Sequence, residues 1–442
     1  MEFFQSYKAG SKCLLINITF KTIKYTKYLN ADLTELEGLV DAAEKVVLES
    51  LSFNHNDPDI KYFCGLGKME IIKNKMSEID ADLVVFNHPL SPSQERNIEK
   101  YLECKVIDRT RLILEIFSLR AKTYEGKLQV ELAQLNYQST RLVKGWTHLE
   151  RQKGGIGVRG GPGETQLEID RRLIRQRIKQ IVAKLEKVKH HRELSRSSRK
   201  KSNVLTISFV GYTNAGKSTL FTKISNANVF VKDQLFATLD PTLRKVSVPK
   251  LGDVIFSDTV GFIRNLPHDL IEAFHATLEE VIESDLLIHV IDFADEDHRS
   301  YIEQVNKVLS EIGAADKPTI CVYNKIDKLE HVNTEVIYFS DVEDNVISRV
   351  YLSAQSGYGI DNFYNALANY FNKSWVKGVL ELSPEYSKIR SELYTLGAVD
   401  SEKISEDGKY LLNIKISESD FNSFSRKYNL DLNSFLVTEG DD

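Results

Sequence analysis

The sequence lacks the features that mark secreted, membrane-spanning and zinc-binding proteins. Its four cysteines, at positions 13, 64, 104 and 321, are scattered and form no Cys-x-x-Cys pair. That pattern is typical of reduced thiols in a cytosolic protein and argues against a zinc site or a disulfide framework. The first residues, MEFFQSYKAGSK, have no apolar core of a signal peptide. No apolar run reaches the length of about 18 residues that suggests a membrane span, so we expect a cytoplasmic protein.

The charge balance excludes a bulk nucleic-acid binder. Net charge is −5, so any basic surface has to be local. The hydrophobic fraction of 42% and the charged fraction of 27% are ordinary for a globular protein. At about 100–200 residues per domain, the 442 residues predict two to four domains.

Short apolar runs alternate with helical patterns in residues 1–122. We predict strands at 12–20, 82–88 and 105–109, and helices at 32–50, at 91–102 and from 110 onward. Ser91, followed by Gln94 three positions later, is typical of a helix start. Alternating strands and helices indicate a parallel sheet, so residues 1–122 are predicted to form an N-terminal α/β domain.

Two helical segments, 127–143 and 164–200, each carry an apolar seam. The seam residues are Leu128, Leu132, Leu135, Ser139 and Leu142 in the first segment and Leu167, Ile174, Ile178, Ile181, Leu185 and Val188 in the second. Two such helices joined by a loop can pair as an antiparallel hairpin, which we predict over residues 123–202. The alternative is two ordinary amphipathic helices that pack on neighbouring domains.

A glycine-rich loop, GGIGVRGGPGE, joins these two segments. Gly155, Gly157 and Gly160 spell the dinucleotide-binding pattern, but no strand precedes them and no acidic residue follows at the expected distance. From Arg171 to Lys201 the chain has thirteen Lys and Arg against two Glu. A solvated face usually mixes signs, whereas a one-signed stretch favours phosphate.

The segment LTISFVGYTNAGKSTLF (205–221) has the pattern of a P-loop between a strand and a helix. Its glycines let the backbone wrap around phosphate. Lys217 is expected to contact the β- and γ-phosphates, and the Ser218 hydroxyl to bind Mg²⁺. The predicted nucleotide contacts here are Gly211, Tyr212, Thr213, Asn214, Ala215, Gly216, Lys217, Ser218 and Thr219. We expect this α/β domain to cover 203–372 and a small C-terminal α+β domain to cover 373–442.

Two later motifs indicate guanine. Asp327 ends the motif Asn324, Lys325, Ile326, Asp327, and its carboxylate can accept from both N–H donors on the guanine edge, which adenine lacks. Asn324 is expected to hold the loop and contact the base. The second motif is Ser353, Ala354, Gln355, where the Ala354 N–H is expected to donate to guanine O6.

Two segments are predicted to respond to the γ-phosphate. After the strand DVIFS come Asp258, Thr259, Val260 and Gly261, where an aspartate can hold the metal through water and a glycine N–H can meet the γ-phosphate. The first switch is predicted at Phe236, Ala237, Thr238, Leu239 and Asp240. Thr238 is the preferred Mg²⁺ ligand there, with Thr242 as the competing candidate. Phe262 stands where small GTPases often carry a water-orienting glutamine, so no catalytic residue is assigned.

Together these residues resemble the HflX family of translational GTPases, close to the Obg-like branch. The resemblance covers most of the chain, and its motifs are GLGK, GYTNAGKST, FATLDPT, DTVGFIRNLPHDLIEAFHATLEE, NKID, SAQSG and RLVKGWTHLERQKGGIGVRGGPGETQLEIDRRLIRQRI. The long run is the most diagnostic, because P-loop GTPases at large lack it. Many relatives read GIGxRGPGE, so the pair Gly160-Gly161 is a departure of one glycine.

The resemblance implies a GTPase that binds Mg²⁺ with GTP or GDP, binds the large ribosomal subunit and is stimulated there. It also implies dissociation or rescue of stalled ribosomes under stress, by a protein expected to be a monomer. We expect the glycine-rich loop to be the tip of the hairpin and to meet 23S rRNA, which is recognised by shape and backbone contacts. The candidate RNA contacts are Arg151, Lys153, Gly155, Gly157, Arg159, Gly160, Arg171, Arg172 and Arg175.

Two other functions remain open from the sequence. A signalling GTPase that acts through protein effectors would share the nucleotide motifs, although the one-signed basic stretch argues against it. An ATP-driven RNA-remodelling enzyme would need a nucleotide site in the first domain, and residues 1–120 contain no P-loop.

Overall fold

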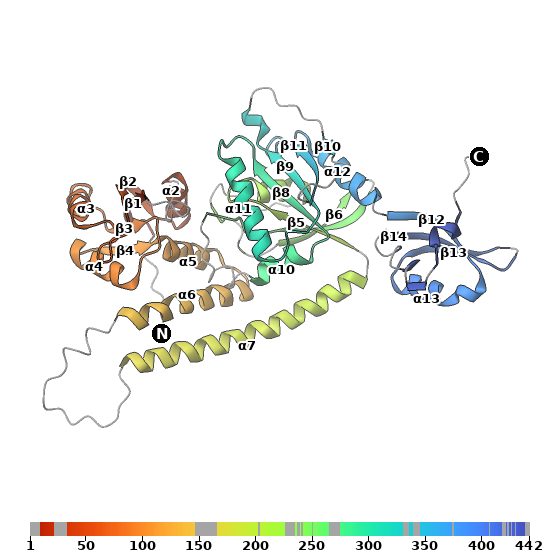
Figure 1. Ribbon diagram of the computed structural model, residues 1–442, viewed down its shortest axis with the longest axis horizontal. Coiled ribbons are helices and arrows are strands. Elements are labelled where there is room, and N and C mark those ends of the chain that lie inside the picture. The colour runs from red at the N-terminus through yellow and green to blue at the C-terminus, as the bar shows by residue number, and fades with distance from the viewer. Residues whose placement is uncertain are drawn as a thin grey trace.

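The computed structural model of the chain shows two α/β units above a long helical hairpin and a C-terminal unit to their right (Figure 1). Three β-sheets are present in the described part of the chain. The structure describes residues 9–21, 33–145, 166–201, 204–225, 235–236, 239, 242–249, 251–264, 275–329, 336–338, 345–373, 375–405, 407–417, 421, 424–425, 427–428 and 430–437.

The first sheet is parallel, with strand order β2-β1-β3-β4. Helix α4 begins with the predicted capping box, in which the Ser91 hydroxyl accepts the Gln94 N–H and the Gln94 side chain accepts the Ser91 N–H. The elements are β1 (Lys12–Phe20), α2 (Leu33–Ala42), β2 (Val46–His55), α3 (Leu66–Ile79), β3 (Leu83–Phe86), α4 (Pro92–Leu102), β4 (Lys105–Asp108) and α5 (Arg109–Arg120).

The predicted helix at 32–50 is wrong beyond residue 42. The chain turns through Glu44 in the left-handed conformation, at φ 58°, and then enters strand β2. Strand β2 pairs in parallel with β1 along its whole length. Tertiary pairing therefore overrides a local pattern that reads as helical.

The predicted antiparallel hairpin is confirmed by helices α6 (Tyr124–Gly145) and α7 (Gln166–Lys201). Leu128 and Leu135 of α6 pack with Ile174 and Ile181 of α7 in one buried cluster. Leu132, Ile178 and Leu185 border it. The Arg177 guanidinium contacts Glu131 at 2.6 Å and Arg192 contacts Glu125 at 2.8 Å, so ion pairs flank the seam. Figure 1 shows α7 running beneath the first sheet and the central sheet.

The central sheet has strand order β10-β11-β9-β8-β5-β7-β6, with only the two outer pairings antiparallel. Its strands are β5 (Leu205–Val210), β6 (Thr242–Val248), β7 (Gly252–Asp258), β8 (Leu286–Asp292), β9 (Thr319–Asn324), β10 (Ile337–Tyr338) and β11 (Val346–Tyr351). Its helices are α8 (Lys217–Ser225), α10 (His275–Glu283), α11 (His298–Glu311) and α12 (Ile360–Lys373), with the 3₁₀ turn η1 (Ile326–Lys328).

The C-terminal sheet is smaller and pairs as β13-β14-β12-β15, with antiparallel neighbours. Its apolar face packs against helix α13 (Ser387–Thr395) and against Phe421 and Phe424. The strands are β12 (Trp375–Leu382), β13 (Val399–Ile404), β14 (Tyr410–Ser417) and β15 (Leu436–Val437), and the 3₁₀ turns are η3 (Pro384–Tyr386) and η4 (Leu432–Phe435).

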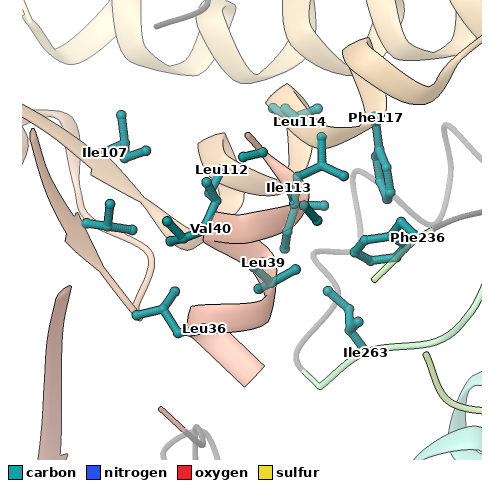
Figure 2. Close-up of a cluster of buried hydrophobic side chains, with 14 of the residues drawn as sticks. Leu36, Leu39, Val40, Ile107, Leu112, Ile113, Leu114, Phe117, Phe236 and Ile263 are labelled. Atoms are coloured by element: carbon teal, nitrogen blue, oxygen red, sulfur yellow. The ribbon is translucent and has the colours of Figure 1, made fainter. Parts of the chain in front are cut away.

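One hydrophobic core is shared between the N-terminal unit and loops of the central unit (Figure 2). Leu39 of α2 and Phe117 of α5 line it from the N-terminal side. Phe236 and Ile263, which belong to loops of the central unit, enter it from the other side. The rings of Phe117 and Phe236 meet edge to face with centroids 4.8 Å apart. The two units are therefore joined by continuous apolar packing.

The sheets suggest where the domains begin and end. We propose boundaries after residues 122, 202 and 372, because the first two fall between α5 and α6 and between α7 and β5, and the third falls at the end of α12. In the described ranges we find no helix that combines the length and the apolar character needed to cross a membrane.

Candidate nucleotide-binding site

The predicted motifs gather at one edge of the central sheet. The P-loop follows β5, the segment from Asp258 ends β7, and the two guanine motifs follow β9 and β11. These four strands are parallel, so their carboxyl ends lie together. The P-loop strand β5 lies between β7 and β8, where the connections diverge to the two sides of the sheet. Ligands of open α/β sheets bind at such a point.

The P-loop glycines are required by geometry. Gly211 has φ 146°, and a Cβ added to it would lie 2.3 Å from the Val290 carbonyl oxygen. Gly216 has φ 94°, and its added Cβ would lie 2.2 Å from Asn324 Nδ2. Neither position accepts a side chain, because the contacting atoms belong to the backbone or to a buried amide.

Lys217 is almost fully buried, with 6% exposure, at the start of α8. Its ammonium donates to the carbonyl oxygens of Gly211 at 3.1 Å and Tyr212 at 2.7 Å. Burial lowers the pKa of this ammonium to about 8, and nearby Asp258 acts in the opposite direction. The lysine is thus a poorly solvated charge placed directly beneath the P-loop, where bound phosphate would stabilise it.

Nucleotide affinity should therefore fall in mildly alkaline solution. The free protein loses the Lys217 proton as pH rises through about 8, whereas bound phosphate favours the charged form. Binding above that pH takes up a proton, so affinity should fall by up to about tenfold per pH unit. Titration with fluorescent GDP between about pH 7 and about pH 9 measures this. Lys217→Arg stays charged throughout and should lose the pH dependence. A flat profile for the unaltered protein would contradict the assignment.

The residues predicted to hold Mg²⁺ fit a hard cation. Ser218 Oγ donates to Asp258 Oδ2 at 2.7 Å, so a hydroxyl and a carboxylate oxygen already meet at the helix start. Asp258 is 2% exposed, which keeps its carboxylate at this position. Oxygen donors of these two kinds are those that Mg²⁺ prefers. Thr238 lies outside the described residues.

The guanine motifs and the P-loop are tied together by one amide. Asn324 Nδ2 donates to the Ala215 carbonyl at 2.8 Å, and Asn324 Oδ1 accepts the Ala354 N–H at 2.9 Å. Asn324 therefore holds the loops, as predicted from the sequence. The Ala354 N–H is engaged by this amide, so donation to guanine O6 requires that bond to be exchanged. Asp327 is exposed and makes no hydrogen bond to other described residues, so its carboxylate can accept from a base.

The remaining residues of the guanine motifs support the loops. Lys325 adopts the left-handed conformation and pairs with Asp292 at 2.7 Å. Ser353 is buried, and its Oγ accepts the Ser356 N–H at 3.2 Å, while Ile326 is buried and Gln355 is exposed.

Two residues of the first switch, Phe236 and Leu239, belong to the described part of the chain. Phe236 and Leu239 are buried in the core shared with the N-terminal unit. Ala237, Thr238 and Asp240 lie outside the described residues. The competing candidate Thr242 begins β6, where it is paired with Asp258 in the antiparallel register.

The segment after β7 is fastened to the P-loop. Phe262 N donates to the Gly211 carbonyl at 3.1 Å, and Phe262 O accepts the Thr213 N–H at 2.7 Å. The Phe262 ring is 4% exposed and packs in the core with Val210 and Leu278. Thr259 donates its hydroxyl to the Phe209 carbonyl, so this side chain also faces the sheet. Val260 joins the shared core.

Gly261 lies directly beside the P-loop. A Cβ on Gly261 would come within 2.9 Å of Lys217 Nζ and 2.8 Å of Thr213 Cγ2. Only glycine fits there, which agrees with a backbone placed close to bound phosphate.

Sequence reasoning missed the residues that reach the P-loop from the N-terminal unit. The Tyr212 hydroxyl donates to Glu35 of α2, which is 177 residues earlier in the chain. Tyr212 also stacks on Tyr301 of α11, with ring centroids 4.1 Å apart. No local sequence pattern predicts such a contact, because Glu35 looks like any acidic residue in the first turn of a helix.

The predicted RNA contacts divide into two groups. Arg171, Arg172 and Arg175 lie on α7, where Arg172 and Arg175 are exposed. The others, Arg151, Lys153, Gly155, Gly157, Arg159 and Gly160, lie outside the described residues, as does the glycine-rich loop as a whole.

Comparison with known families covers the chain in three stretches. Residues 30–118 match the family described as GTP-binding GTPase N-terminal, and residues 120–199 match GTP-binding GTPase Middle Region. Residues 206–325 match the family described as 50S ribosome-binding GTPase.

Curated relatives extend over nearly the whole length. The GTPase HflX of Escherichia coli strain K12 is 50% identical over 413 residues, which is 93% of this chain and 95% of the relative. GTPase HflX of Caldanaerobacter subterraneus subsp. tengcongensis is 45% identical over 380 residues, 85% of each chain. A solved GTP-binding protein from the archaeon Sulfolobus solfataricus, in complex with GDP, aligns over 81% of this chain and 98% of its own at 22% identity, with a TM-score of 0.43 that carries no inference.

The P-loop, the guanine motifs and the full-length similarity agree with one another, and the chain belongs to the HflX family of GTPases.

Proposed function

We propose that this GTPase binds the large ribosomal subunit through its hairpin and uses GTP-dependent switching to dissociate or rescue stalled ribosomes in the cytoplasm. The observation that carries the proposal is the outer face of α7. Arg172, Arg175, Lys179, Lys184, Lys187 and Lys189 are all exposed on this helix, against the single exposed acid Glu186 in that span. A basic face of one sign in a net-acidic protein favours a polyanionic partner such as rRNA.

The position of this face supports the same partner. The seam with α6 occupies one side of α7, while Arg175, Lys179, Lys184 and Lys187 are exposed on the helix and Lys189 pairs with Glu279 of α10. The first described residue of α7, Gln166, lies two positions after the glycine-rich segment, which ends at Glu164. A helical arm with a glycine-rich end can bring backbone close to folded RNA. The family description of residues 206–325 names the 50S subunit, which is consistent with this partner.

The nucleotide site supports a GTPase that depends on its partner. The position that often holds a water-orienting glutamine is occupied by Phe262, whose ring is buried in the core of the central unit. That side chain cannot position water. We therefore propose slow hydrolysis by the isolated protein and faster hydrolysis when the ribosome supplies or reorganises the missing group.

The roles of the site residues follow from their placement. Lys217 and the P-loop N–H groups would bind the β- and γ-phosphates, and the Gly261 N–H would meet the γ-phosphate. Ser218 and Asp258 would hold Mg²⁺, which neutralises phosphate charge when bound. Asp327 would select guanine.

The test is GTP turnover with and without purified 50S subunits at low and high salt. We expect strong stimulation by the subunit that weakens with salt, because phosphate contacts release counterions. Replacing residues 154–163 with a Gly-Ser linker of equal length should abolish ribosome binding and leave GTP binding intact. If 50S subunits do not stimulate GTP turnover, a signalling GTPase that acts through protein effectors becomes the preferred function.

A matched pair of variants separates the arm from overall charge. Arg172→Glu with Arg175→Glu changes the charge of α7, whereas Lys307→Glu with Lys403→Glu makes the same change on α11 and β13, where both lysines are exposed. Only the α7 pair should lower the salt sensitivity of 50S binding. Equal effects of the two pairs would indicate nonspecific electrostatic attraction.

A further inference from the structure

A line of hydrogen bonds runs from the P-loop into the N-terminal unit. The Tyr212 hydroxyl donates to Glu35 and accepts the Arg264 backbone N–H at 2.8 Å. Glu35 pairs with the Arg109 guanidinium at 2.7 Å, and their side chains are only 9% and 4% exposed. Arg109 also donates to the Arg264 carbonyl at 3.2 Å. The same side chains therefore fasten both the P-loop and the segment after β7.

Asp108, which precedes Arg109 in the sequence, faces the hairpin. Asp108, which is 1% exposed, accepts the Tyr137 hydroxyl at 3.0 Å and the Arg141 guanidinium at 2.6 Å, and both partners belong to α6. Arg141 also pairs with Glu95 and lies over the Tyr137 ring at 4.1 Å. Asp108 ends β4 and caps α5, while Arg109 is the first residue of α5. One junction thus contacts the P-loop side and the arm.

A gain in folding stability alone does not account for this buried network of charged side chains. Burying charges carries a desolvation cost that well-packed apolar side chains avoid. The shared core beside it already supplies apolar contact between the two units (Figure 2). Directional bonds add a defined relative position, because each guanidinium and carboxylate fits one arrangement of its partners.

This network of hydrogen bonds also contacts segments that are expected to move. Val260 and Ile263, on either side of Gly261, enter the shared core, as does Phe236 of the first switch. When nucleotide occupancy rearranges these segments, their contacts with α2 and α5 have to change as well. The packed core and the ionic chain together form an element that both sites can bias.

We propose that Glu35, Arg109, Asp108 and Arg141 are positioning residues that couple the nucleotide site to the hairpin arm. The state of the P-loop then influences the orientation of α6, and a partner that binds one orientation of α6 changes the equilibrium affinity for nucleotide by the same free energy, because coupling between binding equilibria is reciprocal. The identity of the arm's partner rests on the proposed function, whereas the coupling is measured on the isolated full-length protein.

The test uses the dissociation rate of a fluorescent GDP in the absence of ribosomes. Arg141→Met removes the α6 end of the chain and is expected to accelerate release about fivefold, the lower end of typical coupling. Arg141→Lys keeps the charge beside Asp108, so its GDP dissociation rate should lie between that of Arg141→Met and that of the unaltered protein. In combination with Tyr212→Phe, which opens the P-loop end, the two effects should be less than multiplicative because both interrupt one path.

Two control variants remove comparable groups that do not belong to this hydrogen-bond network. Arg177→Met deletes the arginine–carboxylate pair between α7 and α6 that does not involve Asp108. Tyr301→Phe removes a hydroxyl beside Tyr212 that makes no hydrogen bond in the described part of the chain. Both should release GDP at the unaltered rate.

Two results would overturn the coupling. One is an unaltered rate for Arg141→Met in a protein whose thermal unfolding shows that it is folded. The other is strictly multiplicative effects in the double variant. A lack of 50S stimulation would contradict the proposed function and leave this result unaffected, so the two failures are distinguishable.

Discussion

Asp327→Asn is expected to weaken GTP binding by roughly 100-fold or more and to favour xanthosine triphosphate. The carboxylate would accept from two guanine donors, and each hydrogen bond to a charged group contributes about 1.5–3 kcal/mol. An asparagine presents an N–H₂ where guanine also presents one, so one bond becomes a repulsion. Xanthine carries a carbonyl oxygen at that position, which the asparagine amide can satisfy.

Competition of each nucleotide against fluorescent GDP measures this change. Asp327 is exposed in η1, so the substitution should leave the fold intact. The matched control is Asp316→Asn, an exposed residue before β9 that loses the same charge. A fall in GTP affinity below about tenfold would mean that another group recognises the base edge, because one charged hydrogen bond alone exceeds that value.

Lys45→Met is expected to destabilise the N-terminal sheet by about 3–5 kcal/mol. Lys45 Nζ lies 3.0 Å from Glu115 Oε2, and both side chains are only 2% exposed. Arg111 Nε is more distant from Glu115, at 3.8 Å. Removal of the lysine therefore leaves a buried carboxylate with much weaker compensation. Amide hydrogen exchange in β1 and β3 should accelerate roughly 100-fold or more, since exchange reports local opening.

Two further variants check the cause. Combining Lys45→Met with Glu115→Leu removes both charges and should recover most of the lost protection. Lys12→Met breaks the exposed pair with Asp80, whose side chain is 91% exposed, and should change stability by less than about 1 kcal/mol. If the double variant is as unstable as Lys45→Met, lost packing rather than unpaired charge is responsible.

The nucleotide site was accessible to sequence reasoning because its parts are local. A P-loop needs a strand, two glycines, a lysine and a helix in succession, and all of these lie between Leu205 and Phe221. The guanine motifs likewise follow apolar strands directly. The hairpin was predictable for a similar reason, since the 7-residue seam of α7 is written in consecutive turns.

Features that depend on distant partners were not accessible. Residues 46–50 look helical in isolation, and only pairing with β1 makes them a strand. The contact of Tyr212 with Glu35 joins residues 177 apart. The burial of Phe236 against Phe117 depends on how two α/β units dock, which periodicity within either unit does not report. The nucleotide contacts therefore remain predictions from local motifs, and the fold brings these residues into a geometry that is compatible with nucleotide binding.

The length of α7 has a mechanical consequence. Its 36 residues form one helix, which at 1.5 Å per residue is about 54 Å long. About two thirds of the way along the helix, Lys189 pairs with Glu279 of α10 at 3.3 Å, and the helix begins at Gln166, just after the glycine-rich segment. The part of α7 between Gln166 and Lys189 is about 35 Å long, so a rotation of about 5° at Lys189 would displace Gln166 by about 3 Å. A small rotation where α7 meets α10 can thus become a much larger shift at the start of the helix.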